Sequence, residues 1–254
     1  MKINTSFAAA GLLSANSLAA QLAQPASRVG WWQADTNYAS LSGSSITAIN
    51  DAGNSVSYPA MSAVAGSSPL LTSGAINGLT AASFNGSTQF LTNSAAPYRF
   101  VTAGPFTVAM IFKPAAGSAY GYPFGFWTSS NHGCTLGVDG ADNMSWTMGN
   151  GYLTAPAARG AWHLAICACD TFVQKLRVDG VTKPVASTDN AQPAVGGTPT
   201  IGALTAVGGT GFNGLISDTW FFNEDLFATN PKVIGLLERF AAQVYGLGIT
   251  PYGG

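Results

Sequence analysis

The stretch FNGLISDTWFFNEDL, residues 212–226, has the pattern of a β-strand that ends in a turn. Counted in twos, Ile216, Trp220 and Phe222 fall on one face, and Asp218 lies among them. The chain has only 11 acidic side chains, so an acid inside an apolar row needs a physical reason. A catalytic acid, a metal ligand and a structural clamp are the three interpretations that this position leaves open.

Around this stretch, the chain is long enough for one sizeable core and carries few charges. No Pro/Gly/Ser linker or run of charge divides its 254 residues, which favours one main domain. Charged residues make up 8% of the chain, against about 25% in typical domains, and the net charge is −1. We therefore expect neither nucleic acid nor an anionic membrane as a partner. Partners that cover the surface, or an uncharged Ser/Thr-rich β surface, would both explain the low charge.

The three cysteines do not form a disulfide framework, because their number is odd and Cys167 and Cys169 stand two apart on one probable strand. No group of histidines accompanies them at zinc-binding spacing. We expect Cys134, Cys167 and Cys169 to be small buried apolar residues.

Residues 1–27 have a composition of their own. Lys2 followed by an Ala/Leu-rich run resembles a secretory signal, but polar residues interrupt the apolar segment. The segment is also too polar to span a bilayer. We expect a retained arm that is helical between Ser6 and Ala23, ends at Pro25 and anchors the chain to another subunit.

From Arg28 onward, short alternating segments predict an all-β domain. Apolar side chains alternate along FTVAMIFKP (106–114), and residues 162–185 have the pattern of a three-strand meander with a turn at Asp179-Gly180. Residues 81–92 predict a hairpin that turns at Asn85-Gly86, and residues 144–154 predict another. Strands and turns at this spacing indicate a sandwich.

One helix is predicted over residues 231–245. Asn230 is a suitable N-cap, Pro231 fits the first helical position, and Gly246 suits the C-terminal end. Its apolar stripe predicts that it lies against the sandwich; the stripe consists of Val233, Ile234, Leu237, Phe240, Ala241 and Val244.

Taken in order, these segments resemble the concanavalin A-like lectin/glucanase superfamily, especially its laminin G-like branch. The matching segments between Val29 and Gly248 are WWQAD, SFNGSTQFLT, FTVAMIFKP, WHLAI before RVDG, FNGLISDTWFFNEDL, and a helix that ends in YGLG. The resemblance implies a two-sheet antiparallel jelly-roll sandwich over residues 28–254. Sugar binders, glycosidases, lyases and structural modules share this fold, so it does not name the function.

Catalytic patterns are missing from the sequence. Retaining glucanases of this superfamily place paired carboxylates on one strand, whereas the only glutamates here are Glu224, in a turn, and Glu238, on the predicted helix. His132 and His163 are isolated, and no basic or tyrosine cluster of the kind that lyases need is visible. We expect no enzymatic activity, with glycoside hydrolysis as the lesser alternative.

For Asp218, the resemblance implies a structural acid. Strict alternation would point the Asp218 side chain inward with Ile216, whereas a β-bulge nearby would turn it in another direction. We expect a clamp whose carboxylate accepts backbone N–H groups.

Calcium is an alternative at the loop VDGADN, where Asp139, Asp142 and Asn143 offer oxygen ligands. The loop lacks a downstream bidentate glutamate, and turn formation explains the same residues. We therefore expect no cofactor or metal.

A sugar-binding site is the first functional hypothesis, because tyrosine and tryptophan rings stack on sugars while Asn and Asp hold hydroxyl groups. Phe124 and Phe126 are expected in the core. The candidate sugar-binding residues are Tyr120, Tyr122, Trp127, Asp142, Asn143, Asn150 and Tyr152.

The second hypothesis is a structural subunit that displays the sandwich on a large assembly, joined through residues 1–27. By type of architecture, we expect a homo-oligomeric decoration or fibre protein on the surface of a tailed-phage virion. Such a subunit can also bind host cell-surface glycans. The alternative is a secreted bacterial carbohydrate-binding module in the extracellular space.

Overall fold

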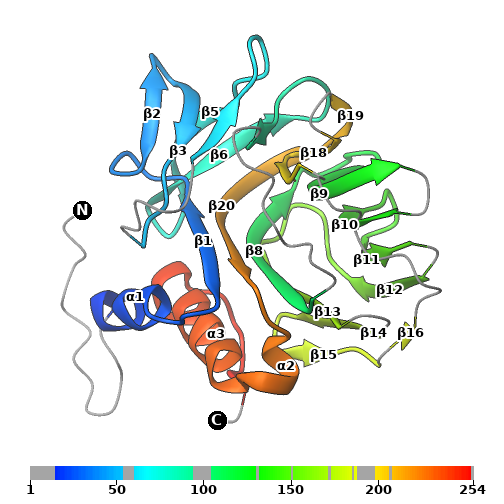
Figure 1. Ribbon diagram of the computed structural model, residues 1–254. Helices are drawn as coiled ribbons and strands as arrows, with labels where there is room; N and C mark the ends of the chain where they lie inside the picture. The colour runs from blue at the N-terminus through cyan, green and yellow to red at the C-terminus, as the bar shows by residue number, and fades with distance from the viewer. Residues whose placement is uncertain are drawn as a thin grey trace.

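The computed structural model shows an antiparallel β fold with helices on one side (Figure 1). The residues that it describes are 15–53, 60–93, 104–129, 132–149, 151–170, 173–184, 186–187, 198–205 and 208–252.

The front sheet runs in the order β12–β11–β10–β9–β17–β7–β4–β3–β2. Its strands are β2 (Ala39–Ser42), β3 (Ser45–Ile49), β4 (Met61–Ala63), β7 (Leu91–Thr92), β9 (Gly121–Ser129), β10 (His132–Val138), β11 (Asn143–Met148), β12 (Gly151–Pro156) and β17 (Thr200–Ile201).

The back sheet runs in the order β14–β13–β8–β20–β1. Its strands are β1 (Arg28–Gln33), β8 (Phe106–Pro114), β13 (His163–Asp170), β14 (Val173–Val178) and β20 (Asn213–Phe222). Further strands extend this layer: β5 (Leu70–Ile76) and β6 (Leu79–Asn85) beside β20, and β15 (Val181–Thr182) and β16 (Ala186–Ser187) beside β14.

The main core fills the space between the two sheets. Phe106, Val108, Met110 and Phe112 of β8 all face it, as their alternation predicts. Leu176 and Val178 of β14 face it too, and the three cysteines are buried there as free thiols. The predicted two-sheet antiparallel sandwich is therefore confirmed.

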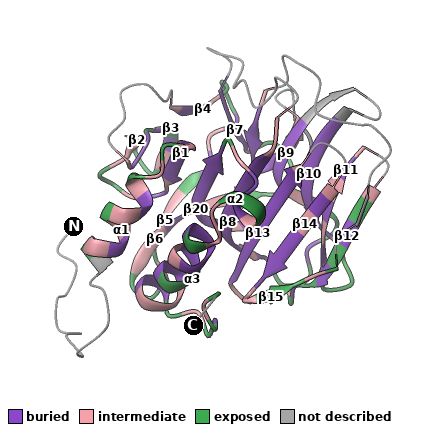
Figure 2. Cartoon of the chain, turned by 60° about the horizontal axis from the view of Figure 1, so that its bottom comes forward, coloured by how far each residue is buried: buried purple, intermediate pink, exposed green. Residues whose placement is uncertain are grey.

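A second core covers the other face of the back sheet, so these strands are buried on both sides (Figure 2). Ala109 and Ile111 of β8, which point away from the main core, belong to this second core together with helix α3 (Pro231–Tyr245) and helix α1 (Ala15–Ala23). The molecule is thus layered as helices, back sheet and front sheet. The outer face of the front sheet lies opposite the helices.

Helix α3 confirms the predicted bounds and the predicted stripe, whose residues are all buried. Pro231 occupies its first turn, and Gly246 closes it in the left-handed conformation at φ 72°. The prediction for Asn230 was wrong in one respect: its side chain makes no capping hydrogen bond. A short helix, α2 (Leu226–Thr229), immediately precedes Asn230 and leaves it as the link between two helices.

An ion pair joins α3 to the back sheet. Arg177 of β14 donates to both carboxylate oxygens of Glu238, at 2.7 and 3.2 Å. Glu238 is fully buried and also accepts a hydrogen bond from the backbone N–H of Tyr252 at 2.5 Å. This contact fixes the position of the helix on the sheet.

The predicted hairpin at Asn85-Gly86 was wrong. Strand β6 pairs with β5 and β20, whereas β7 pairs with β4 and β17 in the front sheet. The Asn85 carboxamide instead accepts the backbone N–H groups of the next residues, and the chain crosses between sheets. The hairpin forms at Asn77-Gly78, where both residues adopt positive φ.

Helix α1 packs against α3, and its Leu18 and Leu22 are fully buried in the second core. The predicted helix from Ser6 to Ala23 is thus present from Ala15 onward, and its earlier residues lie outside the described part of the chain. None of the described helices has the length and apolar character needed to cross a membrane.

Candidate functional site

The outer face of β11 and β12 is an open surface built from uncharged side chains. Along β11, Met144, Trp146 and Met148 point into the main core, so Ser145 and Thr147 point outward. Along β12, Leu153 and Ala155 are buried, while Tyr152 and Thr154 alternate with them and are exposed. The ring of Tyr152 stands free, with a relative exposure of 67%.

Tyr120 and Tyr122 form a pair at one end of this face. Their ring centroids are 5.0 Å apart and their planes lie at 84°, an edge-to-face contact. Burial and a hydrogen bond with Tyr120 raise the pKa of Tyr122, so its hydroxyl stays neutral. Tyr122 therefore supports Tyr120, which remains 42% exposed.

The hydroxyl of Tyr120 reaches over β10. A Cβ placed on Gly137 would lie 2.8 Å from the Tyr120 hydroxyl and 3.1 Å from the Ser145 hydroxyl. Both hydroxyls therefore lie over Gly137, and any larger residue there would displace them. The missing side chain lets Tyr120 lie close to the sheet.

Tyr152 lies on the same face, further along the sheet. Ser145 pairs with Thr154, and Tyr152 stands two residues before Thr154 on β12. With strands about 4.8 Å apart and about 3.3 Å per residue, the backbones of Ser145 and Tyr152 are roughly 8 Å apart. The two exposed tyrosines thus bracket a strip of hydroxyl groups. We name this surface, formed by Tyr120, Ser145, Thr147, Tyr152 and Thr154, the tyrosine strip.

A small hairpin lies over the same face at β9. It consists of β18 (Ala203–Thr205) and β19 (Gly208–Gly211). A Cβ on Gly125 of β9 would lie 2.2 Å from the carbonyl oxygen of Leu204, so β18 runs directly over this glycine. The hairpin covers the face beside β10 and leaves the part formed by β11 and β12 open.

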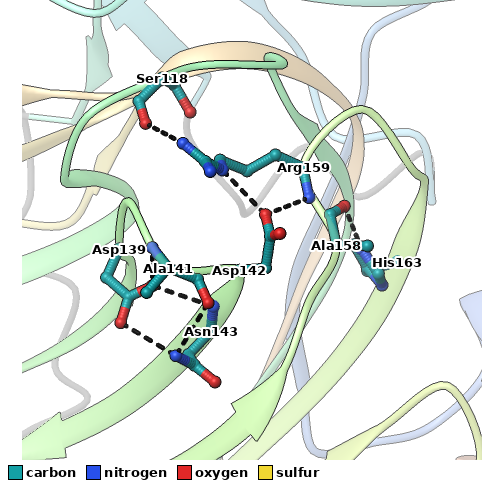
Figure 3. A network of polar contacts seen from close by, with 8 residues as sticks. All are labelled: Ser118, Asp139, Ala141, Asp142, Asn143, Ala158, Arg159 and His163. Atoms are coloured by element: carbon teal, nitrogen blue, oxygen red, sulfur yellow. Dashed lines mark hydrogen bonds and ion pairs between the residues drawn. The ribbon is translucent and has the colours of Figure 1, made fainter.

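A polar network holds the turn between β10 and β11 next to the strip (Figure 3). The Asp142 carboxylate accepts hydrogen bonds from Arg159, through the backbone N–H at 3.0 Å and through Nε at 2.8 Å. Arg159 Nη1 also donates to the carbonyl oxygen of Ser118, at 2.9 Å. Arg159 therefore links this turn to the segment that leads into Tyr120.

The two acids among the candidate calcium ligands already accept hydrogen bonds from the protein. Asp139 Oδ1 accepts the backbone N–H groups of Ala141 and Asn143, and its Oδ2 accepts the amide of Asn143 at 3.3 Å. Figure 3 shows the Asp142 carboxylate directed toward Arg159 and away from Asp139. Within the described ranges, no group of three His, Cys, Asp or Glu side chains is placed to hold a metal.

Asp218 lies on the opposite side of the molecule, between the back sheet and α3. A β-bulge between Ile216 and Asp218 turns the acid toward the helices, so Ile216 faces the main core while Trp220 and Phe222 face the second core. The single apolar face predicted for Ile216, Trp220 and Phe222 was therefore wrong.

The partners of Asp218 are side chains and not the predicted backbone N–H groups. Its carboxylate accepts hydrogen bonds from Trp31 Nε1 at 2.7 Å, from the Ser217 hydroxyl at 2.9 Å and from the Tyr245 hydroxyl. Complete burial raises the pKa of Asp218 to about 6, although these three donors oppose the shift. The site connects β1, β20 and α3.

The remaining predicted residues divide between the core and the undescribed part of the chain. Phe124 and Phe126 are core residues, and so is Trp146. The side chain of Trp127 and all of Asn150 lie outside the described residues. Asp142 and Asn143 lie beside the strip, and Tyr120, Tyr122 and Tyr152 surround or support it.

The sequence also held signals that the prediction did not use. Ser145, Thr147 and Thr154 are the outward members of two alternating strands, so the predicted hairpin already implied their outward orientation. Arg159 had no such signal, because its contacts with Asp142 and Ser118 depend on the assembled sheet.

Comparison with known sequences identifies the family. The profile of the concanavalin A-like lectin/glucanases superfamily described as Laminin_G_3 matches residues 75–230, which is more than half of the chain. The chain belongs to this superfamily. A search among curated proteins finds no significant match.

Solved structures of similar fold include a sialidase from Trypanosoma rangeli in complex with sialic acid, with 13% identity and a TM-score of 0.59. The match covers 87% of this chain and 33% of the sialidase, so the chain spans about a third of that protein. Domain 4 of AbnA, an extracellular arabinanase from Geobacillus stearothermophilus in complex with arabinotriose, has 17% identity and a TM-score of 0.50. That match covers 77% of this chain and 91% of the domain.

Proposed function

We propose that this lectin-like domain binds glycans through the tyrosine strip, without catalysis. The observation that carries the proposal is the pairing of two exposed tyrosine rings with an open row of Ser and Thr hydroxyls. Tyrosine faces stack on the C–H surfaces of sugar rings, and hydroxyl groups exchange hydrogen bonds with sugar hydroxyls. The arabinotriose held by the arabinanase domain of similar fold supports this type of ligand.

The positions of the two glutamates support the absence of catalysis. Glu224 accepts hydrogen bonds from the hydroxyls of Ser27 and Thr229 in the turn after β20. Glu238 is buried in its ion pair with Arg177 on the helical side of the molecule. Neither carboxylate lies on the front sheet, whereas a retaining glycosidase needs two carboxyl groups about 5 Å apart across the sugar.

We also propose that the domain is displayed in many copies on a larger assembly, either a tailed-phage virion or an extracellular complex. The charged share of only 8% supports coverage of part of its surface by other subunits. Purified particles from the source, analysed by mass spectrometry, would test this. Stoichiometric recovery of the chain is expected, and its exclusive presence as free secreted protein would contradict the proposal.

Glycan binding is tested with a multivalent form of the protein on an array of cell-surface polysaccharides. Tyr152→Ala and Tyr120→Ala should each lower the affinity for any bound glycan on the order of tenfold, because each removes a stacking surface. Tyr252→Ala is the matched control, since Tyr252 is a similarly exposed tyrosine that lies over Arg177 near α3. Equal loss in all three variants, or binding that survives both strip substitutions, would contradict the proposed site.

A further inference from the structure

The strands of the tyrosine strip carry no charge. In the sequence of β9, β11 and β12 there is no Asp, Glu, Lys, Arg or His, and β10 carries only His132. The outward side chains of β11 and β12 are hydroxyl-bearing, apart from Pro156 and the Asn143 amide beside the turn. A ligand on this surface therefore contacts hydroxyl groups and aromatic rings, because no side chain of the strip is charged.

Arg159, a cation beside the strip, already forms an ion pair with Asp142. Its Nε and backbone N–H are bound to the Asp142 carboxylate, and its Nη1 is bound to the carbonyl oxygen of Ser118 (Figure 3). A sugar carboxylate is recognised best by a free guanidinium that offers two parallel N–H groups. The contact with Asp142 occupies Nε, so the side-on pair of N–H groups formed by Nε and Nη2 is not free.

The same turn carries an excess of negative charge. Hydrogen bonds from Arg159 lower the pKa of Asp142, and the backbone N–H of Asn143 lowers the pKa of Asp139. Both acids are therefore ionised at neutral pH, and Arg159 balances one of them. The net negative charge repels an anionic ligand that approaches the strip from this end.

We infer that the tyrosine strip selects uncharged glycans and rejects glycans that carry carboxylates, such as sialylated or uronic acid chains. The inference rests on the glycan-binding function proposed above and narrows its ligand class.

The experiment compares ligands that differ only in charge. The multivalent protein is tested on polygalacturonate and on its carboxyl-reduced form, and on one milk oligosaccharide with and without terminal sialic acid. Within each pair of glycans that the protein binds, the neutral glycan is expected to bind at least about tenfold more tightly than the acidic one. Raising NaCl from about 50 to about 500 mM should leave that binding nearly unchanged, because no ion pair is screened.

Asp142→Asn provides the complementary variant. Asn tolerates the left-handed backbone at this position, where φ is 61°, so the turn should keep its shape. The substitution removes one negative charge and leaves Arg159 without its counter-charge, and acidic glycans should then gain affinity at least about threefold in a salt-sensitive manner. Asp35→Asn is the control, since it removes one negative charge at a turn outside the strip.

The possible failures can be told apart. Tighter, salt-sensitive binding of the acidic member by the unaltered protein would overturn the charge selectivity while leaving glycan binding intact. Indifference to charge in both ligand pairs would overturn it as well. Absence of binding to every glycan, in a protein shown to be folded, would overturn the proposed function and the inference together.

Discussion

At the scale of single residues, Asp218 shows how burial and hydrogen bonding compete over one carboxylate. Desolvation disfavours its charge, and three side-chain donors favour it. The balance raises its pKa from 3.8 to about 6, so the acid is mostly ionised at neutral pH at a cost to stability. That cost is on the order of 3 kcal/mol, since each pKa unit corresponds to about 1.4 kcal/mol.

The pH dependence of stability follows from this shift. Between about pH 4 and 6 the folded state binds the proton more tightly than the unfolded state, so stability falls as pH rises through this window. Asp218→Asn removes the titration. We expect the unfolding free energy of the unaltered protein to fall relative to Asp218→Asn by about 1–3 kcal/mol from pH 4 to pH 7, measured by urea denaturation.

A companion variant separates charge from hydrogen bonding. Asp218→Ala leaves the buried Trp31 indole N–H without an acceptor and should be about 1–3 kcal/mol less stable than Asp218→Asn at every pH, because neither variant titrates at this position. A stability difference between the unaltered protein and the Asp218→Asn variant that stays flat from pH 4 to 7 would show that the carboxyl group does not titrate in this range.

At the scale of elements, the back sheet was the part that sequence patterns predicted best. The alternation of β8, the Asp179-Gly180 turn and the stripe of α3 are local features, and all three are present. Asn77-Gly78 and Asn85-Gly86 could not be told apart from sequence, because both dipeptides suit a tight turn. Asn77-Gly78 forms the hairpin since β6 finds its partners in β5 and β20, and that choice depends on the whole sheet.

The candidate site was predictable to a lesser extent. Tyr120 and Tyr152 could be proposed from residue type alone, but their common face depends on the register of β11 with β12. The partners of Asp218 include Trp31 and Tyr245, 187 and 27 residues away in the chain, so no local pattern could indicate them.

The ion pair between β14 and α3 gives a prediction at this scale. Glu238→Gln leaves the Arg177 guanidinium buried without its counter-charge and should destabilise the protein by about 3–5 kcal/mol in urea unfolding. Replacing both partners by Met should cost much less, because no buried charge then remains unpaired. Arg239→Gln, on the exposed side of the same helix, should change stability by less than about 0.5 kcal/mol. A Glu238→Gln cost as small as that of Arg239→Gln would mean that packing alone holds α3.

At the scale of the whole molecule, the shallow strip limits how tightly one copy can bind. Desolvation of sugar and protein hydroxyls offsets much of the gain, so a single site should have a dissociation constant of roughly 0.1–1 mM, or about 4–6 kcal/mol. Linked copies should gain about 10²–10⁴-fold in apparent affinity without new contacts. Titration of the monomer by NMR and of a streptavidin-linked tetramer by biolayer interferometry would measure both values. Nanomolar binding by the monomer would contradict the shallow site.

The order of the layers also makes the two sides of the molecule different. The helices lie on one side of the back sheet and the tyrosine strip lies on the far side of the front sheet, with two packed cores between them. A copy that is attached through its helical side must therefore hold its strip away from the support, at a height set by the rigid layers. Neighbouring copies attached in the same way would all direct the tyrosine rings of their strips outward and parallel to one another. On a surface coated in this manner, reach and alignment would come from the architecture and would need no flexible tether.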